Sequence, residues 1–279
     1  MVASRESRVP SLSRITKELL ASYNRHPRKR LGQHFLTDPQ VLQRIINAAE
    51  LDIDDLVIEI GSGLGVVTSE IAKLVYHLVA IEIDKELLKI SKDVLKLFHN
   101  ISFEPKDILK IDLHELALGR KYKIIGNLPY YITAPIIEKI LEAKDKAELA
   151  VLMVQKEVAE RMAEAPGSKK YGSFSVFVQY HAEVKLNSFV SKSSFLPWPE
   201  VGSALVVLKP HQTPKYKVKD EKLFFDIVHA AFQQRRKQLS NSLSEFKIEG
   251  IDIDLSRRPE TLGIDEFVKI TNYCYNPSS

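Results

Sequence analysis

Three glycines at alternate positions follow an acidic residue in the run from Glu59 to Gly65, which reads Glu-Ile-Gly-Ser-Gly-Leu-Gly. The apolar segment Leu56–Ile60 before this run has a strand pattern, and residues 66–75 after it have a helical pattern. The glycines therefore lie on a turn between a strand and a helix. Because glycine has no Cβ, such a turn can bend tightly and let a ligand approach the backbone N–H groups. The run predicts a small-molecule site.

The spacing of the glycines narrows the choice of ligand. Dinucleotide-binding turns have the spacing G-x-G-x-x-G, but this chain has Val66 at the third glycine position, and no Gly-Lys-Ser/Thr of a P-loop follows. Glu82 lies near the end of the next apolar segment, residues 77–83, where a carboxylate can accept hydrogen bonds from both hydroxyls of an adenosine ribose. These features favour S-adenosylmethionine over NAD.

A second motif, Asn127-Leu128-Pro129-Tyr130, follows the strand-like residues 123–126 and precedes a helical pattern. It is expected at the carboxyl edge of a parallel sheet, where ligands bind in such folds. The Asn127 side-chain oxygen and the Leu128 carbonyl can accept the two N–H bonds of the exocyclic amine of adenine. Pro129 would stiffen the loop, and Tyr130 could stack on the purine. Because a sulfonium is already an activated electrophile, positioning and electrostatics can supply most of the rate.

With these two motifs in view, the chain resembles the KsgA-type ribosomal RNA adenine dimethyltransferases over nearly its whole length. The further matching stretches are Lys-Arg-Leu-Gly-Gln-His-Phe-Leu at 29–36, Gln-Lys-Glu-Val-Ala-Glu-Arg at 155–161, Tyr-Gly-Ser at 171–173, Phe-Leu-Pro-Trp-Pro-Glu-Val at 195–201, Gln-Arg-Arg-Lys at 234–237 and Arg-Pro-Glu at 258–260. Each stretch alone is modestly specific, whereas together they are highly specific.

This resemblance implies the transfer of two methyl groups from S-adenosylmethionine to N6 of each of two adjacent adenosines near the 3′ end of small-subunit ribosomal RNA. It implies the small ribosomal subunit and its RNA as partners. Together, the motifs and the resemblance give the cofactor-binding residues His34, Leu36, Glu59, Gly61, Gly63, Glu82, Asp107 and Asn127. The expected catalytic pocket consists of Asn127, Leu128, Pro129, Tyr130 and Phe195. The chain departs from common family residues at His34, Tyr131 and Gly202.

Several of these residues have simpler structural interpretations. Glu59 could form an ordinary surface ion pair, and Asp107 could cap a helical turn, because Asp is a favoured N-cap residue. Tyr130 and Phe195 could be core aromatics, which is the common fate of such side chains. For both aromatics, the surrounding motifs favour stacking on a purine.

Positive charge is concentrated in two stretches. Residues 1–30 contain eight Lys or Arg and two acidic residues, and Arg28, Lys29 and Arg30 directly precede the expected site. Arg235, Arg236 and Lys237 follow a helical pattern at residues 223–232. We expect both groups to bind RNA phosphates. The alternative for the second group is a solvated helix end, where cations interact favourably with the helix dipole.

Composition indicates a protein that folds without disulfides or a membrane anchor. The 279 residues are 44% hydrophobic, which is sufficient for one large and one small core, and they contain a single cysteine, Cys274. No apolar run approaches the roughly 18 residues of a membrane span, and the histidines lack metal-ligand spacing. We therefore expect a cytoplasmic monomer with no metal and no contact with membranes.

The order of the elements predicts an α/β fold. Strand and helix patterns alternate from residue 56 to residue 155, which indicates a mainly parallel, Rossmann-like sheet of the class I methyltransferase type. Strand patterns at residues 183–190 and 203–209 suggest an antiparallel edge. We expect a basic flexible tail at residues 1–27, a methyltransferase domain at 28–210 and a small helical, RNA-contacting domain at 211–279.

Three alternative functions remain open from the sequence. A related methyltransferase could act on large-subunit ribosomal RNA and confer antibiotic resistance, although the longer C-terminal segment and the Arg-Pro-Glu turn favour the small subunit. A DNA adenine methyltransferase would share the motif that starts at Asn127 but not the remaining motifs. A noncatalytic assembly factor could retain the fold, although the intact glycines, Glu82 and Asn127 argue against a loss of catalysis.

Overall fold

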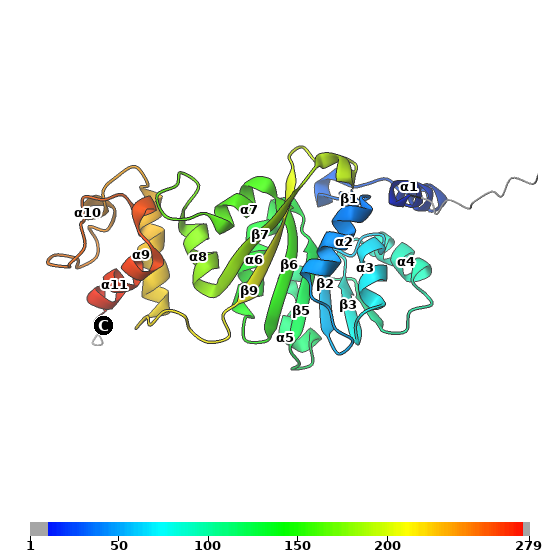
Figure 1. Ribbon diagram of the computed structural model, residues 1–279, viewed down its shortest axis with the longest axis horizontal. Coiled ribbons are helices and arrows are strands. Elements are labelled where there is room, and N and C mark those ends of the chain that lie inside the picture. Colours follow the sequence, from blue (N-terminus) through cyan, green and yellow to red (C-terminus); the bar gives the residue numbers. More distant parts are fainter. Residues whose placement is uncertain (1–10, 276–279) are drawn as a thin grey trace, which may run out of the picture.

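The computed structural model describes residues 11–275, in which a seven-stranded sheet forms the centre (Figure 1). In spatial order the strands are β4 (Ile101–Glu104), β3 (His77–Ile81), β2 (Leu56–Ile60), β5 (Tyr122–Asn127), β6 (Ala147–Gln155), β9 (Ser203–Pro210) and β7 (Ala182–Val190). In this sheet β9 runs in the direction opposite to the other six strands, so its pairs with β6 and β7 are antiparallel and the remaining pairs are parallel. The predicted α/β fold, with a mainly parallel sheet and an antiparallel edge, is confirmed; β9 lies one strand in from that edge.

Helices cover both faces of this sheet, as a mainly parallel sheet requires. Val57 and Ile58 of β2 point to opposite faces because side chains alternate along a strand, and both are completely buried. On one side, Val57 shares a core with α2 (Pro39–Ala48) and α3 (Val66–Ala72). On the other side, Ile58 packs in a core with α6 (Thr133–Glu142) and α8 (Ser173–His181).

The remaining elements connect these layers. The helices are α1 (Leu12–Ser22), α4 (Lys85–Val94), α5 (Leu113–Leu116), α7 (Lys156–Ala163), α9 (Glu221–Gln233), α10 (Leu239–Ser242) and α11 (Ile264–Cys274). The 3-10 turns are η1 (Lys29–Leu31), η2 (Ile108–Lys110), η3 (Tyr130–Ile132), η4 (Lys192–Ser194) and η5 (Pro259–Thr261). A two-stranded antiparallel sheet joins β1 (Phe35–Leu36) to β8 (Phe195–Leu196). Across residues 11–275, no helix is both long and apolar enough to cross a membrane.

The helix α1 differs from the flexible tail predicted for residues 1–27, of which residues 1–10 lie outside the described part. Ser11 caps α1 by accepting a hydrogen bond from the Arg14 backbone N–H. Leu20 is buried in a cluster with Leu64 of the glycine turn and Leu87 of α4. The sequence did not reveal this helix because only Thr16 and Leu20 of α1 are buried, and Leu20 anchors the segment beside the glycine turn.

The C-terminal helices α9 and α11 form a third core at the left end of Figure 1. This core includes Phe224 and Phe267 from the C-terminal segment, but also Tyr171 and the α8 residues Val176 and Tyr180. The predicted division at residues 210 and 211 therefore falls at a linker in sequence, whereas the hydrophobic core extends across it. The placement of the domain boundaries stays a prediction.

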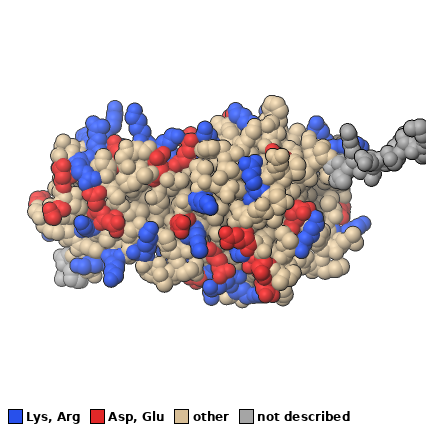
Figure 2. Space-filling model, viewed as in Figure 1, with Lys and Arg blue, Asp and Glu red and all other residues tan. Residues whose placement is uncertain are grey.

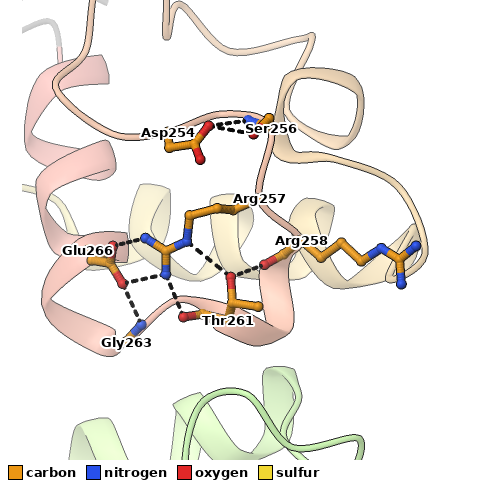
Figure 3. Close-up of polar contacts among 7 residues, drawn as sticks. All are labelled: Asp254, Ser256, Arg257, Arg258, Thr261, Gly263 and Glu266. Carbon is orange, nitrogen blue, oxygen red and sulfur yellow. Dashed lines mark hydrogen bonds and ion pairs between the residues drawn. The ribbon is translucent and has the colours of Figure 1, made fainter.

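A polar network holds the turn between η5 and α11 (Figure 3). The Arg257 guanidinium bonds both carboxylate oxygens of Glu266, and its Nη2 also donates to the Thr261 carbonyl at 2.6 Å. Glu266 in turn accepts from the Gly263 N–H at 3.0 Å, which satisfies one of the first amides of α11. This ion pair lowers the pKa of Glu266. The neighbouring Arg258 side chain extends away from the network (Figure 3).

Candidate active site

A cavity lies where β2, β3 and β5 end, at the carboxyl edge of the parallel strands, and it holds about 1190 Å³ of unfilled space that is partly open to solvent. All eight expected cofactor-binding residues line it; one of them, Asn127, is also an expected catalytic residue, and two further expected catalytic residues line the cavity as well. These residues are His34, Leu36, Glu59, Gly61, Gly63, Glu82, Asp107 and Asn127, with Pro129 and Phe195. Leu128 and Tyr130 are not among the lining residues; Leu128 is buried and donates its backbone N–H to the Met153 carbonyl at 3.0 Å.

The glycine turn shapes one wall of the cavity through its backbone. Gly61 has a φ of +79°, a left-handed value that side chains other than glycine rarely adopt. Its N–H donates to the Ile81 carbonyl of β3 at 2.9 Å. A Cβ at Gly61 would lie 3.2 Å from the Asn127 carbonyl oxygen. The backbone at the end of β2 therefore lies so close to the backbone of Asn127 that a side chain at Gly61 would be crowded.

Glu82 fixes the turn from the next strand. Its Oε2 accepts from the Gly63 N–H at 3.0 Å, and its Oε1 accepts from the Asp84 N–H at 2.9 Å. Burial raises the pKa of Glu82, although the two backbone hydrogen bonds favour the charged form. Because each carboxylate oxygen has two lone pairs, Glu82 retains capacity for further donors in the cavity.

Glu59 is buried at the end of β2, with only 2% of its surface exposed. The surface ion pair considered for this residue is therefore wrong. Burial raises the pKa of Glu59 to about 7, and the nearby charge of Glu82 adds to this effect. Among residues 11–275 the Glu59 Oε2 atom has no hydrogen bond of standard geometry, although the buried Thr68 hydroxyl is near enough to offset part of the rise in the pKa of this carboxyl. A buried acceptor of this kind favours a polar group of a ligand or water in the cavity.

Asp107 has the capping role that its sequence position suggested, and it also lies in the cavity wall, while its contact to the cofactor stays a prediction. Its Oδ1 accepts from the Leu109 N–H at 3.0 Å and caps η2, while the residue lines the cavity. Since capping uses only one carboxylate oxygen, it is compatible with a contact to the amino group of an adenine.

Asn127 is held by a contact with a distant segment. Its side-chain Nδ2 donates to the His34 carbonyl at 2.9 Å. Because a carbonyl only accepts, this contact fixes the orientation of the amide and leaves Oδ1 as the acceptor end. Gly126, just before it, leaves no room for a side chain, since a Cβ would lie 2.8 Å from Leu128 Cδ2. The Asn127 side chain is thus presented in one orientation.

Tyr130 is braced on two sides. Its ring stacks on His34 with centroids 5.6 Å apart and planes 26° apart, and its hydroxyl lies 2.6 Å from Ser203 Oγ. The His34 Nδ1 in turn donates to the Pro197 carbonyl at 2.9 Å. Burial raises the pKa of Tyr130, so its phenol stays protonated at neutral pH. The stacking of Tyr130 on a purine stays a prediction.

For Phe195 the sequence allowed either a place in the hydrophobic core or a place at the site, and the residue lies where the two meet. It is 1% exposed and belongs to the core on the α2 side of the sheet, yet its side chain also lines the cavity. Its strand β8 pairs with β1, which places Phe195 opposite Leu36. This pairing brings residues 34–36 and 195–197 together over the site.

The expected RNA-binding cations divide into two groups. Arg28 pairs with the buried carboxylate of Asp84 at 3.1 Å, and Arg235 donates through Nη2 to the Lys169 and Tyr171 carbonyls, both at 2.8 Å. These two side chains have structural partners that the sequence could not reveal. The exposed cations are Lys29, Arg30, Arg236 and Lys237. Lys and Arg side chains also gather at the upper left of Figure 2, over the end that contains α9 and α10.

Asp84 and Gln33 are site residues that the sequence analysis missed. Asp84 caps α4 through Oδ1, while its Oδ2 accepts from Gln33 Nε2 at 3.0 Å in addition to pairing with Arg28. The three residues connect the segment before β1 to the strand end that bears Glu82. The position of Asp84 directly before the helical pattern at residue 85 could have indicated its capping role. Its side-chain partners could not be predicted, because they are 51 or more residues away in the sequence.

Comparisons with known proteins agree with this geometry. The model of the ribosomal RNA adenine dimethylase family matches residues 24–274. Proteins named ribosomal RNA small subunit methyltransferase A are similar: that of Clostridium botulinum (strain Kyoto / Type A2) is 41% identical over 271 residues, which cover 94% of this chain and 98% of the relative. That of Halothermothrix orenii is 43% identical over 263 residues, covering 91% and 86%.

Solved structures share the fold. A dimethyladenosine transferase from Plasmodium falciparum has a TM-score of 0.73 at 25% identity, covering 85% of this chain and 96% of that one. A 23S rRNA methyltransferase has a TM-score of 0.72, but at 22% identity this likeness shows the fold alone. With a family model matched from residue 24 to residue 274 and an intact cavity, the chain belongs to the ribosomal RNA adenine dimethylase family.

Proposed function

We propose that this enzyme transfers methyl groups from S-adenosylmethionine to N6 of two adjacent adenosines near the 3′ end of small-subunit ribosomal RNA, giving N6,N6-dimethyladenosine during small-subunit biogenesis. The observation that carries the proposal is the fixed Asn127 amide beside the glycine turn. The Asn127 side-chain oxygen can accept from a base amine, and Asn127 lines the same cavity as Gly61 and Gly63, which supports the proposal.

The cavity fits the cofactor by the chemistry of its walls. Gly61 lets a ligand approach the backbone, Glu82 can accept the ribose hydroxyls, and the second carboxylate oxygen of Asp107 can accept from an adenine amine. The unpartnered Glu59 Oε2 supplies a further buried acceptor. When bound, S-adenosylmethionine supplies an electrophilic methyl group on a sulfonium.

The protein's contribution to the reaction is to orient the amine. Asn127 Oδ1 and the Leu128 carbonyl accept its N–H bonds and draw the nitrogen lone pair out of conjugation with the ring. Pro129 limits the motion of this loop, and its carbonyl accepts from Thr133 Oγ1 at 3.1 Å. The proton that leaves after each transfer passes to one of these carbonyl oxygens or to water. Rate enhancement then comes from positioning and fixed dipoles.

The choice of the small subunit rests on the relatives. Proteins named for the small subunit are 41–43% identical to this chain over more than nine-tenths of its length. The large-subunit alternative is supported only by a shared fold at 22% identity. A noncatalytic assembly factor would not need the acceptors at Glu59, Glu82 and Asn127.

The direct test is the transfer of tritium from labelled S-adenosylmethionine to naked ribosomal RNA, small subunits and large subunits, followed by nucleoside analysis. We expect the label in small subunits as N6,N6-dimethyladenosine. Label confined to large subunits would move the assignment to the resistance-type reaction. No label in any of the three substrates, despite saturable binding of S-adenosylmethionine by calorimetry, would contradict the proposed reaction.

We further propose that residues 28–210 bind the cofactor and that residues 211–279 contact RNA, in a cytoplasmic monomer that acts on the small ribosomal subunit. The charge of Arg236 and Lys237 supports this. Replacing both with Ala is expected to reduce the salt dependence of RNA binding by about two units of slope, one per lost phosphate contact. Arg235→Ala is the matched control, since it should lower stability while changing the slope less. Equal slopes for the double variant and the unmodified enzyme would contradict RNA contact at these two residues.

A further inference from the structure

Two large aromatic side chains are exposed on segments that adjoin the cavity. Tyr131, in η3, lines the cavity and is 58% exposed, and Trp198, in the loop after β8, is 69% exposed. Exposed apolar side chains that are scattered singly need no explanation. Tyr131 and Trp198 are not scattered in this sense, because the residues adjacent to them in sequence are connected through contacts with His34, which lines the cavity.

The connection runs through three contacts. Tyr130, adjacent to Tyr131, stacks on His34, and His34 donates to the carbonyl of Pro197, which is adjacent to Trp198. The Tyr130 hydroxyl also bonds Ser203, at the far end of the loop that bears Trp198. The backbone segments that bear the two rings are therefore cross-linked by these contacts, while the rings themselves stay exposed.

Cations accompany aromatic rings along the same edge of the sheet. Lys156 Nζ lies 4.9 Å from the centroid of the Phe189 ring, which is 52% exposed. Lys192 bonds the carbonyl of Glu200 and thereby holds the loop that contains Trp198. The pairing of Val190 with Ser203 places these residues at the same end of β7 and β9. Interleaved aromatic and cationic side chains are typical of surfaces that bind single-stranded nucleic acid.

We propose that Tyr131 and Trp198 stack on the unpaired bases that flank the target adenosine, an inference that rests on the proposed function. An adenosine that enters the cavity must leave its stack, which exposes a face of each neighbouring base. Exposed aromatic rings at the cavity mouth replace that lost stacking. Because the two target adenosines are adjacent, a platform of this kind also holds the second target beside the cavity while the first one reacts. Tyr131 and Trp198 are thus substrate-positioning residues.

The tryptophan provides its own probe, because Trp198 is the only tryptophan in the chain. The probe ligand is a short single-stranded oligoribonucleotide with two adjacent central adenosines. Its matched control has abasic ribose on both sides of the adenosines, with the same length and charge. Binding of each is followed by the anisotropy of a labelled oligonucleotide. We expect the intact oligonucleotide to quench Trp198 emission at saturation, and the abasic one to bind about tenfold more weakly without quenching.

Unchanged emission at saturating intact oligonucleotide would overturn the proposal. So would emission that responds to intact small subunits but not to the oligonucleotide or to naked ribosomal RNA, because that result would assign the surface to a ribosomal protein. Failure of the proposed function is distinguishable, since it would appear as an absence of methylated adenosine in every substrate. Methylation with unchanged emission would reject the stacking platform alone.

Substitutions test the same surface by kinetics. We expect Trp198→Ala and Tyr131→Ala each to raise KM for RNA about tenfold. For Trp198→Ala, at a residue that does not line the cavity, we expect little change in kcat, in the affinity for S-adenosylmethionine or in Tm. Trp198→Phe and Tyr131→Phe keep a ring and should retain most of the affinity. Tyr76→Ala is the matched control, since Tyr76 is also 58% exposed but precedes β3 at the opposite edge of the sheet. An equal rise in KM for Tyr76→Ala would contradict a local stacking role.

Discussion

The two halves of the cavity are built in different ways. The glycine turn is fixed by partners within about twenty residues, since the Gly61 N–H donates to the Ile81 carbonyl and the Gly63 N–H donates to the Glu82 carboxylate. The Asn127 half depends on side chains that reach across the sequence, since the partners of the Asn127 bond to His34 are 93 residues apart. The first half is local and tolerates few side chains, whereas the second is assembled only when the whole sheet has formed. The two halves should therefore fail differently when altered.

The largest expected effect is on the Asn127 half. Asn127→Ala removes the amide oxygen that accepts from the base amine and the bond to His34. By analogy with the loss of one preorganised hydrogen-bonding group, kcat should fall by about 10²–10³ or more, while S-adenosylmethionine binding is weakened but measurable. Single-turnover methyl transfer and calorimetry check these two results. Full activity in this variant would remove the base pocket from the mechanism.

Glu59, which belongs to the glycine-turn half, should make the free energy of unfolding depend on pH. Its folded-state pKa of about 7 lies above its ordinary value of 4.5, so the folded protein holds a proton that the unfolded chain has lost between these values. The contribution of Glu59 to the free energy of unfolding is therefore complete below about pH 4.5, and roughly 3 kcal/mol of it is lost as the pH rises through 7. Glu59→Gln should abolish this fall, whereas Glu245→Gln, at an exposed position in the C-terminal segment, should barely change it. Denaturant unfolding from pH 5 to pH 8 measures the difference; parallel curves for Glu59→Gln and the unmodified protein would contradict it.

The glycine turn should be sensitive to a single methyl group. Gly61→Ala and Gly119→Ala each place alanine at a left-handed φ, +79° and +74°, and each should lower stability by about 1–2 kcal/mol. Only the Cβ at Gly61 meets a neighbour, because nothing lies within 4 Å of a Cβ at Gly119. We therefore expect only Gly61→Ala to weaken cofactor binding, by about tenfold or more, as measured by calorimetry. Equal affinities in the two variants would show that close approach at Gly61 is not needed.

The smallest expected effect concerns the brace at Tyr130. Tyr130→Phe removes the hydroxyl that bonds Ser203 but keeps the ring that stacks on His34. Stability should fall by about 1 kcal/mol, and kcat should decrease modestly. In a double-mutant cycle with Ser203→Ala, the combined variant should lose little more than either single variant. Fully additive losses would mean that the two hydroxyls act separately.

The parts of the molecule that the sequence predicted are the local ones. The strand β2 and the turn at Gly61 and Gly63 were predictable because apolar runs and left-handed turns restrict the residue type at each position. Neither the end of α4 at Val94 nor the helix α8 was predicted, because the ends of helices and the conformation of buried apolar segments depend on packing. The pairing of Arg235 with two carbonyls was equally invisible, since its partners lie more than 60 residues away.

The position of β9 determines the order in which the sheet can be completed. The strand ending at Pro210 lies between β6 and β7, both of which precede it in the chain. During synthesis from the N-terminus, the glycine turn can therefore form early, while a gap beside β6 stays open until β9 has emerged and inserted. Ser203, which braces Tyr130, is the first residue of that strand. We expect the glycine turn of the nascent chain to form well before the segment around Asn127 and Tyr130 is complete. An incompletely synthesised molecule should therefore have no methyltransferase activity.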